Sequence, residues 1–213
     1  MNLSYIGGGL SLECATRPVI IEKDNQTFAF FAFCDHCNSG YISLARKDAP
    51  GMLPLYYKLM EQCINSVRGK VDFICVYLHY GLENTSYIHP VERKVAHWLV
   101  DCGTDIVIGG HSHVPKGVEL YKGKPIFYSQ GNLVFGYNSP AWGNNTITQL
   151  EISNKKIEAI KVFEIVSEED RIILPSIVDD IAHTKRLSEI KDVSKALGIN
   201  FMKRNNYLEC VFE

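Results

Sequence analysis

The sequence predicts an α/β fold built around a parallel strand–helix–strand unit. Val71–Leu78 and Asp105–Ile108 are almost continuously apolar, as is typical of strands buried on both faces of a parallel sheet. Between them, Pro90–Cys102 has helical character and ends at Gly103, a residue type that commonly terminates helices. Because a crossover of this length joins parallel neighbours, the three segments predict a βαβ unit.

The segments before this unit predict a hairpin and a helix. Val19–Glu22 and Thr27–Cys34 are short runs rich in β-branched and aromatic residues, and Asp24–Gln26 between them has the composition of a turn. In Pro54–Val67 apolar residues recur every four positions, so they fall near one face of a helix.

The half after the unit predicts mainly antiparallel structure. Its expected strands are Gly117–Tyr121 and Pro125–Tyr128 around a Lys122-Gly123 turn, then Thr146–Ile152 and Ile157–Val166 around an Asn154-Lys155 turn. Asp179–Leu197 is expected to be helical, and Tyr207–Phe212 alternates in the manner of an added edge strand. We therefore expect a main domain over residues 1–170, followed by a helix and an edge strand over 171–213.

The composition describes a globular protein without a strongly charged surface. The chain has 213 residues, is 46% hydrophobic, and carries a formal net charge of −2 with a pI near 6.4. No basic stripe indicates a nucleic-acid partner, and no segment resembles a signal peptide or a transmembrane helix. The seven cysteines lie mostly in apolar segments, as is typical of reduced thiols in the cytoplasm. The chain as written is therefore expected to be cytoplasmic.

Three histidines follow the ends of the two predicted buried strands. His79 comes directly after Val71–Leu78, while His111 and His113 follow Asp105–Ile108 in a glycine-bordered loop. Sites in α/β proteins lie outside the carboxyl ends of parallel strands, so we expect these imidazoles at one edge of the sheet. Neutral imidazole is a common ligand of transition metals. The pattern therefore predicts a metal site rather than three unrelated loop residues.

Five short segments, in the order found here, carry a family resemblance. They are Leu78–Glu83, the helix after Pro90, Asp105–His113, Gly117–Glu119 and Lys124–Phe135. Together they resemble the CapA family of bacterial capsule synthesis proteins, which includes poly-gamma-glutamate synthesis proteins and is similar to calcineurin-like metallophosphoesterases. The resemblance covers about Gly7–Phe135.

The resemblance implies a two-sheet αββα sandwich and a dinuclear site for divalent transition metals such as Mn, Fe or Zn. By this resemblance His79 and His111 would bind one metal, and His113 would bind the other. Glu83 and Asn132 would lie in loops near the site as candidate catalytic residues, although Asn132 as a turn cap stays an open alternative. The implied substrate is a polymer or a phosphoester.

The chain departs from the family pattern where the remaining metal ligands would be. The family begins with a strand bearing a Gly-Asp motif and later has an Asn-Asn-His motif, and neither is found here. We therefore expect a sandwich that lacks its first βα elements, as in an N-terminally truncated member, and an incomplete site. A two-metal mechanism needs ions on both the attacking and the leaving oxygen.

Two interpretations of the function stay open for such a chain. It is either a metal-dependent hydrolase whose missing ligands are supplied by an N-terminal partner chain, or a non-catalytic binding or partner subunit. An unpaired edge of the sheet would favour self-association. If the chain belongs to a longer exported protein, the location would be the cell surface instead.

Cysteines and a helical histidine give weaker signals. Cys34 and Cys37 form a Cys-x-x-Cys pair, a spacing found in zinc and thiol-redox sites. No second pair exists, and Asn38-Ser39-Gly40 follows where a redox site has a helix, so a loop cysteine pair is favoured. His97 and Trp98 in the predicted helix are interpreted as packing residues, and Glu119 as structural.

Overall fold

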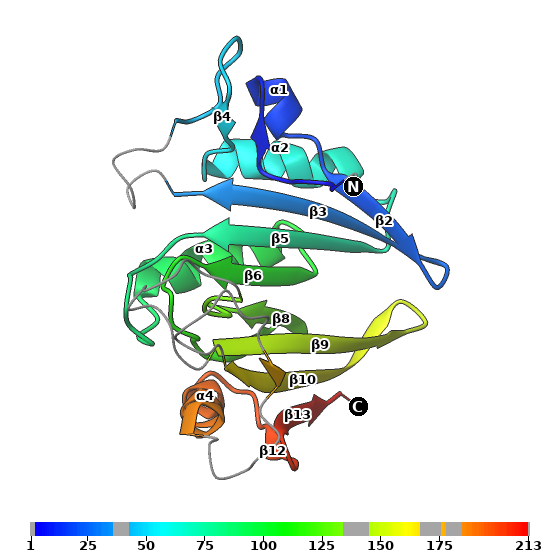
Figure 1. Ribbon diagram of the computed structural model, residues 1–213. Coiled ribbons are helices and arrows are strands. Elements are labelled where there is room, and N and C mark those ends of the chain that lie inside the picture. The colour runs from blue at the N-terminus through cyan, green and yellow to red at the C-terminus, as the bar shows by residue number, and fades with distance from the viewer. Residues whose placement is uncertain (1–2, 36–42, 134–144, 167–175, 178–184, 213) are drawn as a thin grey trace. The chain divides into compact units, whose positions relative to one another are not determined.

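The computed structural model describes residues 3–35, 43–133, 145–166, 176–177 and 185–212 (Figure 1). The protein is a mixed α/β structure in two compact units, and neither unit is one continuous stretch of chain. The first unit comprises Met1–Gly81, His89–Gly110 and Tyr121–Ile126, and the second comprises Leu82–Ile88, His111–Leu120 and Phe127–Glu213. The boundary expected near residue 170 lies outside the described residues.

A parallel core of three strands organises the first unit. Its strands β2 (Val19–Lys23), β3 (Gln26–Cys34), β5 (Phe73–His79) and β6 (Ile106–Gly110) pair in that order, and β8 (Lys124–Phe127) lies mostly in this unit. Strand β7 (Val118–Tyr121) lies mostly in the second unit. Strand β5 is parallel to both β3 and β6. The predicted βαβ unit is therefore confirmed, with β3 as an additional parallel neighbour.

The helices of the first unit begin and end where the sequence indicates. Helix α3 (Pro90–Asp101) has proline in its first turn, and the His89 ring accepts a 3.2 Å hydrogen bond from the Val91 N–H. It ends at Cys102, followed by Gly103 at φ +98°. Figure 1 shows α3 behind β5 and β6. Helix α2 (Tyr57–Val67) lies against β3, and the smaller elements are β1 (Gly8–Gly9), α1 (Leu12–Ala15) and β4 (Gly51–Met52).

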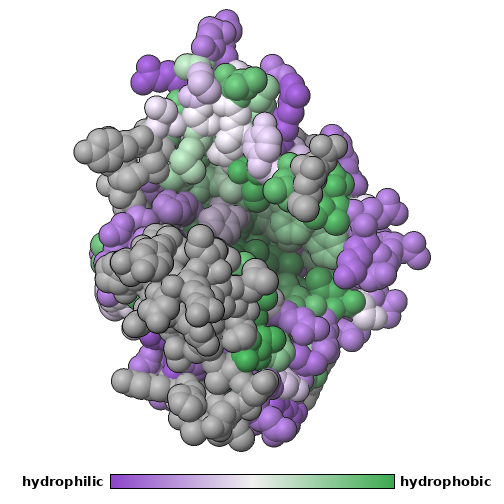
Figure 2. Space-filling view, viewed as in Figure 1, coloured by the Kyte–Doolittle hydropathy of each residue, from purple (hydrophilic) through white to green (hydrophobic). Residues whose placement is uncertain are grey.

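The β2–β3 hairpin closes one side of this sheet. Asp24 and Asn25 have φ of 50° and 58°, the left-handed geometry of a tight hairpin turn, so the predicted turn is confirmed. Strand β2 is at one end of the strand order, and its Ile20 and Ile21 are exposed. Figure 2 shows hydrophobic residues gathered inward of the hydrophilic tip of this hairpin, at the right of the view. The parallel strands are thus flanked by an antiparallel strand, and self-association through this edge stays a prediction.

The second unit contains an antiparallel sheet and one helix. Its elements are β9 (Asn145–Ser153), β10 (Lys156–Val166), β11 (Ser176–Ile177), α4 (Lys185–Ala196), β12 (Met202–Lys203) and β13 (Tyr207–Val211). Strands β9 and β10 form the second predicted hairpin, and Asn154 and Lys155 adopt left-handed φ in its turn. The described part of α4 agrees with the predicted helix, whose first residues lie outside the described range.

The terminal strand is not an edge strand, contrary to expectation. β13 pairs with β10 on one side along five residue pairs, and with β12 on the other side along two. Alternation of apolar residues reports which face of a strand is buried but not whether both its sides are paired. That is why the sequence indicated the strand and not its position in the sheet.

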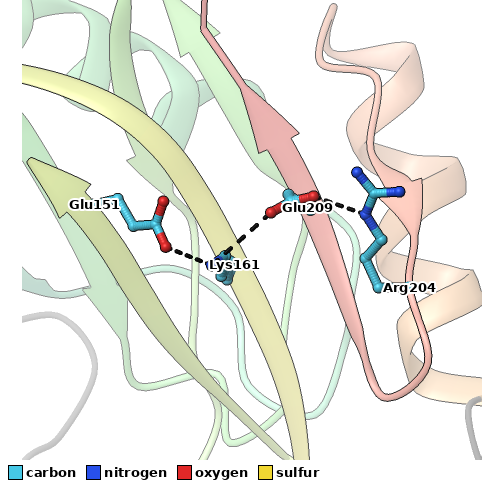
Figure 3. A network of polar contacts seen from close by, with 4 residues as sticks. All are labelled: Glu151, Lys161, Arg204 and Glu209. Atoms are coloured by element: carbon cyan, nitrogen blue, oxygen red, sulfur yellow. Dashed lines mark hydrogen bonds and ion pairs between the residues drawn. The ribbon is translucent and has the colours of Figure 1, made fainter.

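Charged side chains link β9, β10 and β13 across the sheet (Figure 3). Lys161 on β10 forms an ion pair with Glu151 on β9, and its Nζ lies 3.9 Å from Oε1 of Glu209 on β13. The second carboxylate oxygen of Glu209 accepts a 2.7 Å hydrogen bond from Arg204 Nε. Lys161 and Glu209 are directly opposite in the strand register, so their attraction favours the observed pairing.

The cysteines that the structure describes are all free thiols. Burial raises the pKa of Cys75 to about 12 and that of Cys63 to about 11, so both are protonated at neutral pH. Cys34 is also buried, whereas Cys37 and His36 lie outside the described residues, so the Cys-x-x-Cys interpretation is not tested. Among the described helices, none has both the length and the apolar character needed to cross a bilayer.

Candidate functional site

The carboxyl ends of the parallel strands hold one of the predicted site residues. His79 is the last residue of β5, and the strand register sets it beside Cys34 of β3 and Gly110 of β6. The backbone N–H of Asp35 donates a 2.9 Å hydrogen bond to the carbonyl of His79. The backbone of His79 is therefore fixed from the β3 side, and Gly110 directly precedes His111 in the chain.

His111 and His113 lie in the second unit in a tightly held loop. Both have left-handed backbones, with φ of 83° and 60°, which only a small fraction of non-glycine residues adopt. The buried Ser112 between them anchors the loop: its hydroxyl donates to the Val114 carbonyl at 2.6 Å, and its carbonyl accepts from Asn84 N at 2.8 Å. The two rings are 6.2 Å apart between centroids. Such left-handed positions cost about 1–3 kcal/mol each and gather at functional sites.

Asn132 selects the tautomer of the neutral His113 ring. Nδ1 of His113 lies 3.0 Å from Oδ1 of Asn132. An amide oxygen only accepts hydrogen bonds, so Nδ1 donates, and the lone pair of the neutral ring is on Nε2. Metal-binding histidines characteristically donate their other ring N–H to an oxygen in this way. The arrangement makes Asn132 a support for the His113 ring.

Glu83 lies near His111, the other histidine of the loop. Its Oε1 lies 3.6 Å from Nε2 of His111. The His111 side chain is 5% exposed and the Glu83 side chain is 51% exposed, so the carboxylate approaches the imidazole from the solvent side. The distance exceeds that of a hydrogen bond. The pair nevertheless brings together a nitrogen and a carboxylate, two of the donor types that transition metals bind.

The strand that leads into the Asn132 loop is held by buried polar contacts. The Tyr128 hydroxyl donates a 2.6 Å hydrogen bond to the buried Glu119 carboxylate, which supports the structural interpretation of Glu119. Ser129 accepts a backbone hydrogen bond from Lys116 at 3.0 Å, and the Gln130 side chain accepts one from Thr148 at 2.9 Å. The loop therefore starts from a fixed strand.

Asn145 contributes to this loop and was not indicated by any sequence motif. Its Oδ1 accepts a 2.8 Å hydrogen bond from the backbone N–H of Asn132, and the residue is 3% exposed. It lies outside the Lys124–Phe135 motif, at the first position of β9. No periodicity or spacing signal distinguishes it, because its role depends on a contact thirteen residues away along the chain.

The donors of the predicted metal site are brought together in pairs. The second unit joins His113 to Asn132 and His111 to Glu83, and His79 is at the end of β5 in the first unit. Within the part of the chain that the structure describes, no three histidine, cysteine or acidic side chains converge in a way that could hold a metal ion. Transition-metal sites commonly use three or more protein ligands. These residues supply suitable donors but do not complete such a site by themselves.

His97 and Trp98 pack within the first unit. The His97 ring stacks on Tyr121 at 3.7 Å between centroids, and Trp98 meets Tyr57 edge to face at 4.7 Å. The structure therefore agrees with their interpretation as packing residues.

Comparison with known proteins identifies related chains. The family model described as "Bacterial capsule synthesis protein PGA_cap" matches residues 1–137. The PGA biosynthesis protein CapA of Bacillus subtilis (strain 168) is 35% identical over 135 residues, which is 63% of this chain and 35% of that protein. The capsule biosynthesis protein CapA of Bacillus anthracis is 26% identical over 213 residues, which is 98% of this chain and 50% of that protein.

Among solved structures, a phosphatase of Mycoplasma pneumoniae is similar at 14% identity and a TM-score of 0.41, covering 76% of this chain and 56% of that one. The present chain spans half or less of the length of the two CapA relatives.

Proposed function

Because this chain belongs to the bacterial capsule synthesis family PGA_cap, we propose that it serves capsule or poly-gamma-glutamate synthesis through a metal-dependent, hydrolase-type site. Its proposed metal ligands are His79, His111 and His113. Glu83 and Asn132 are the accompanying polar residues. The activity of the whole protein is part of this proposal, since the chain covers half or less of its relatives' length.

The hydrogen bond between His113 and Asn132 carries the proposal. In the neutral ring it favours the tautomer with the proton on Nδ1 and the lone pair on Nε2, the form in which histidine binds a metal through Nε2. The left-handed backbones of His111 and His113 add to it, because strained positions persist where function requires them. His79 is included on its place at the end of β5, in register with Gly110.

The proposed cofactor is a divalent transition metal ion, with Mn, Fe and Zn as candidates. When bound, such an ion would act as a Lewis acid on a phosphoryl or carbonyl oxygen of a polymer or phosphoester substrate. Because the described residues do not gather three ligands, further ligands would have to come from outside them.

The second candidate is a non-catalytic role. It is favoured by the lack of three converging metal ligands among the described residues. Without three converging ligands in the described residues, the chain would act as a binding or partner subunit. The two candidates are compatible if an N-terminal partner chain supplies the family's acidic ligands. This chain would then be one subunit of a complete metal site. Self-association would be the other route to a complete assembly.

Metal content distinguishes the two candidates. We would measure it by mass spectrometry on the purified chain and on the variants His79→Ala, His111→Ala and His113→Ala. The control is His89→Ser, which replaces another histidine and retains a side chain able to cap α3. The hydrolase-type proposal expects a transition metal in the wild type and the control, and its loss in all three variants. A wild-type chain without bound metal, after exposure to Mn, Fe and Zn, would support the non-catalytic role.

A further inference from the structure

Asn145 is connected to one of the three histidines, His113, through Asn132. It is the first residue of β9, is almost completely buried, and bonds the backbone of Asn132. Asn132 in turn bonds the His113 ring. These two hydrogen bonds link residues 113, 132 and 145, all within the second unit.

The hydrogen bond from Asn132 N to Asn145 requires the loop backbone to approach the Asn145 side chain closely, and this approach depends on Gly131. Gly131 has φ +74°, and a Cβ at this position would lie 2.1 Å from Oδ1 of Asn145. Any side chain would therefore collide with the amide that accepts from Asn132 N at 2.8 Å. Only glycine combines the left-handed backbone with the space for this contact. The loop thus closes directly over the Asn145 side chain.

Neighbouring hydrogen bonds hold the same short stretch of backbone. Thr146, next to Asn145 on β9, donates from its backbone N–H to the Gln130 carbonyl at 3.1 Å. The Gly131 N–H donates to the Ser129 hydroxyl at 3.1 Å. With the backbone held up to Asn132 N, fewer orientations remain for the Asn132 side chain.

The hydrogen bond between Asn132 and His113 determines the tautomer of the neutral His113 ring. The tautomer of a neutral histidine is set by the hydrogen bond that one of its nitrogens makes. With Oδ1 of Asn132 held 3.0 Å from Nδ1, the proton is kept on Nδ1 and the lone pair on Nε2. If the Asn132 backbone lost its anchor, the side chain could leave the ring and both tautomers would become populated.

We propose that Asn145 is a positioning residue that fixes the orientation and the Nδ1–H tautomer of His113 through Asn132. The use of that tautomer in metal binding rests on the proposed function. The tautomer itself is a property of the metal-free chain. It can therefore be tested whether or not the chain binds a metal.

The test reads the tautomer of His113 directly. Proton–nitrogen correlation spectra of metal-free, full-length protein distinguish the two ring nitrogens, at about pH 9, where a histidine of ordinary pKa near 6.5 is neutral. The His113 signals are assigned by their absence in His113→Ala. The variants are Asn145→Ala, which removes the acceptor, Asn145→Leu, which keeps the branched shape without it, and Asn145→Asp, which retains an acceptor oxygen. Thr148→Val is the matched control, because Thr148 lies on the same strand and bonds Gln130 instead.

We expect wild type, Asn145→Asp and Thr148→Val to show His113 as a single Nδ1–H tautomer. Asn145→Ala and Asn145→Leu should lose this preference and show both tautomers, with the other histidine signals and the thermal unfolding transition preserved. A pure Nδ1–H tautomer in a folded Asn145→Ala or Asn145→Leu protein would overturn the proposal. Failure of both to fold would also overturn it, in favour of a purely structural role. Absence of bound metal in the metal-content experiment would leave this result unaffected.

Discussion

Gly81, two residues after His79, lies directly against the carboxyl group of Glu92 in the first turn of α3. A Cβ at residue 81 would lie 2.4 Å from Oε1 of Glu92, and Gly81 has φ +95°. Glu92 is 3% exposed, so its carboxylate has little room to move away. The segment that leaves the end of β5 is therefore shaped by a buried acidic side chain of the following helix.

This contact predicts a large effect of adding one methyl group. We expect Gly81→Ala to lower the free energy of unfolding by about 2–4 kcal/mol, from the left-handed backbone together with displacement of a buried carboxylate. Gly123→Ala is the control, because Gly123 has φ +75° but nothing within 4 Å of its added Cβ. It should cost only about 1–2 kcal/mol. Urea denaturation of both variants measures the difference, and equal losses would contradict the packing argument.

Because His113 has a left-handed backbone, glycine should be more favourable than alanine at this position, the reverse of the order in a helix. His113→Gly should be more stable than His113→Ala by about 1 kcal/mol, because glycine adopts φ 60° without the cost that a Cβ imposes. His97 lies within helix α3, where the order should reverse and alanine should be favoured by about 1 kcal/mol. Chemical denaturation of the four variants tests both signs. A His113→Ala variant as stable as His113→Gly, or more stable, would show that the backbone at residue 113 is not strained.

Burial of Cys75 predicts a loss of stability in alkaline solution. Burial raises its pKa to about 12 in the folded protein from an ordinary value of 9.0, so the unfolded chain releases this proton first. The stabilising contribution is complete below about pH 9 and is lost as the pH rises toward about 12. Unfolding free energies across this range should fall less steeply for Cys75→Ala than for wild type. Parallel curves for the two proteins would contradict the raised pKa.

The cross-strand ion pairs predict that Glu209 matters more than an exposed acidic residue. The Glu209 side chain is 12% exposed and forms ion pairs with both Lys161 and Arg204, whereas the Glu13 side chain, which pairs with Arg17, is 83% exposed. Glu209→Gln should lower the thermal midpoint, and Glu13→Gln should leave it almost unchanged. Because salt screens such pairs, the effect of Glu209→Gln should shrink as ionic strength rises. Calorimetry at low and high salt checks both statements.

Local patterns predicted the elements whose burial is encoded in consecutive residues. The apolar runs that became β5 and β6, and the Asn154-Lys155 turn, report directly on burial and on a left-handed turn. The two-residue pairing of β1 with β4 could not be predicted, because two residues contain no period. The position of β13 between two strands depends on partners that are remote in sequence.

The candidate site was predictable as a set of positions but not as an arrangement. The motifs placed His111, His113, Glu83 and Asn132 in loops, and the structure joins them in two pairs. Which residues pair depends on tertiary contacts between remote positions, nineteen apart for His113 and Asn132 and farther for His111 and Glu83. Asn145 was missed for the same reason, since its burial and its partner exist only in the folded chain.

The interleaved course of the chain has a consequence for how the protein can be dissected and inherited. The path passes from one compact unit to the other at residues 81–82, 88–89, 110–111, 120–121 and 126–127. A single proteolytic cut, or a single recombination breakpoint in the gene, therefore cannot release either unit intact. Evolution could exchange or duplicate these units only together, so the pair behaves as one heritable module even though its contacts divide it in two.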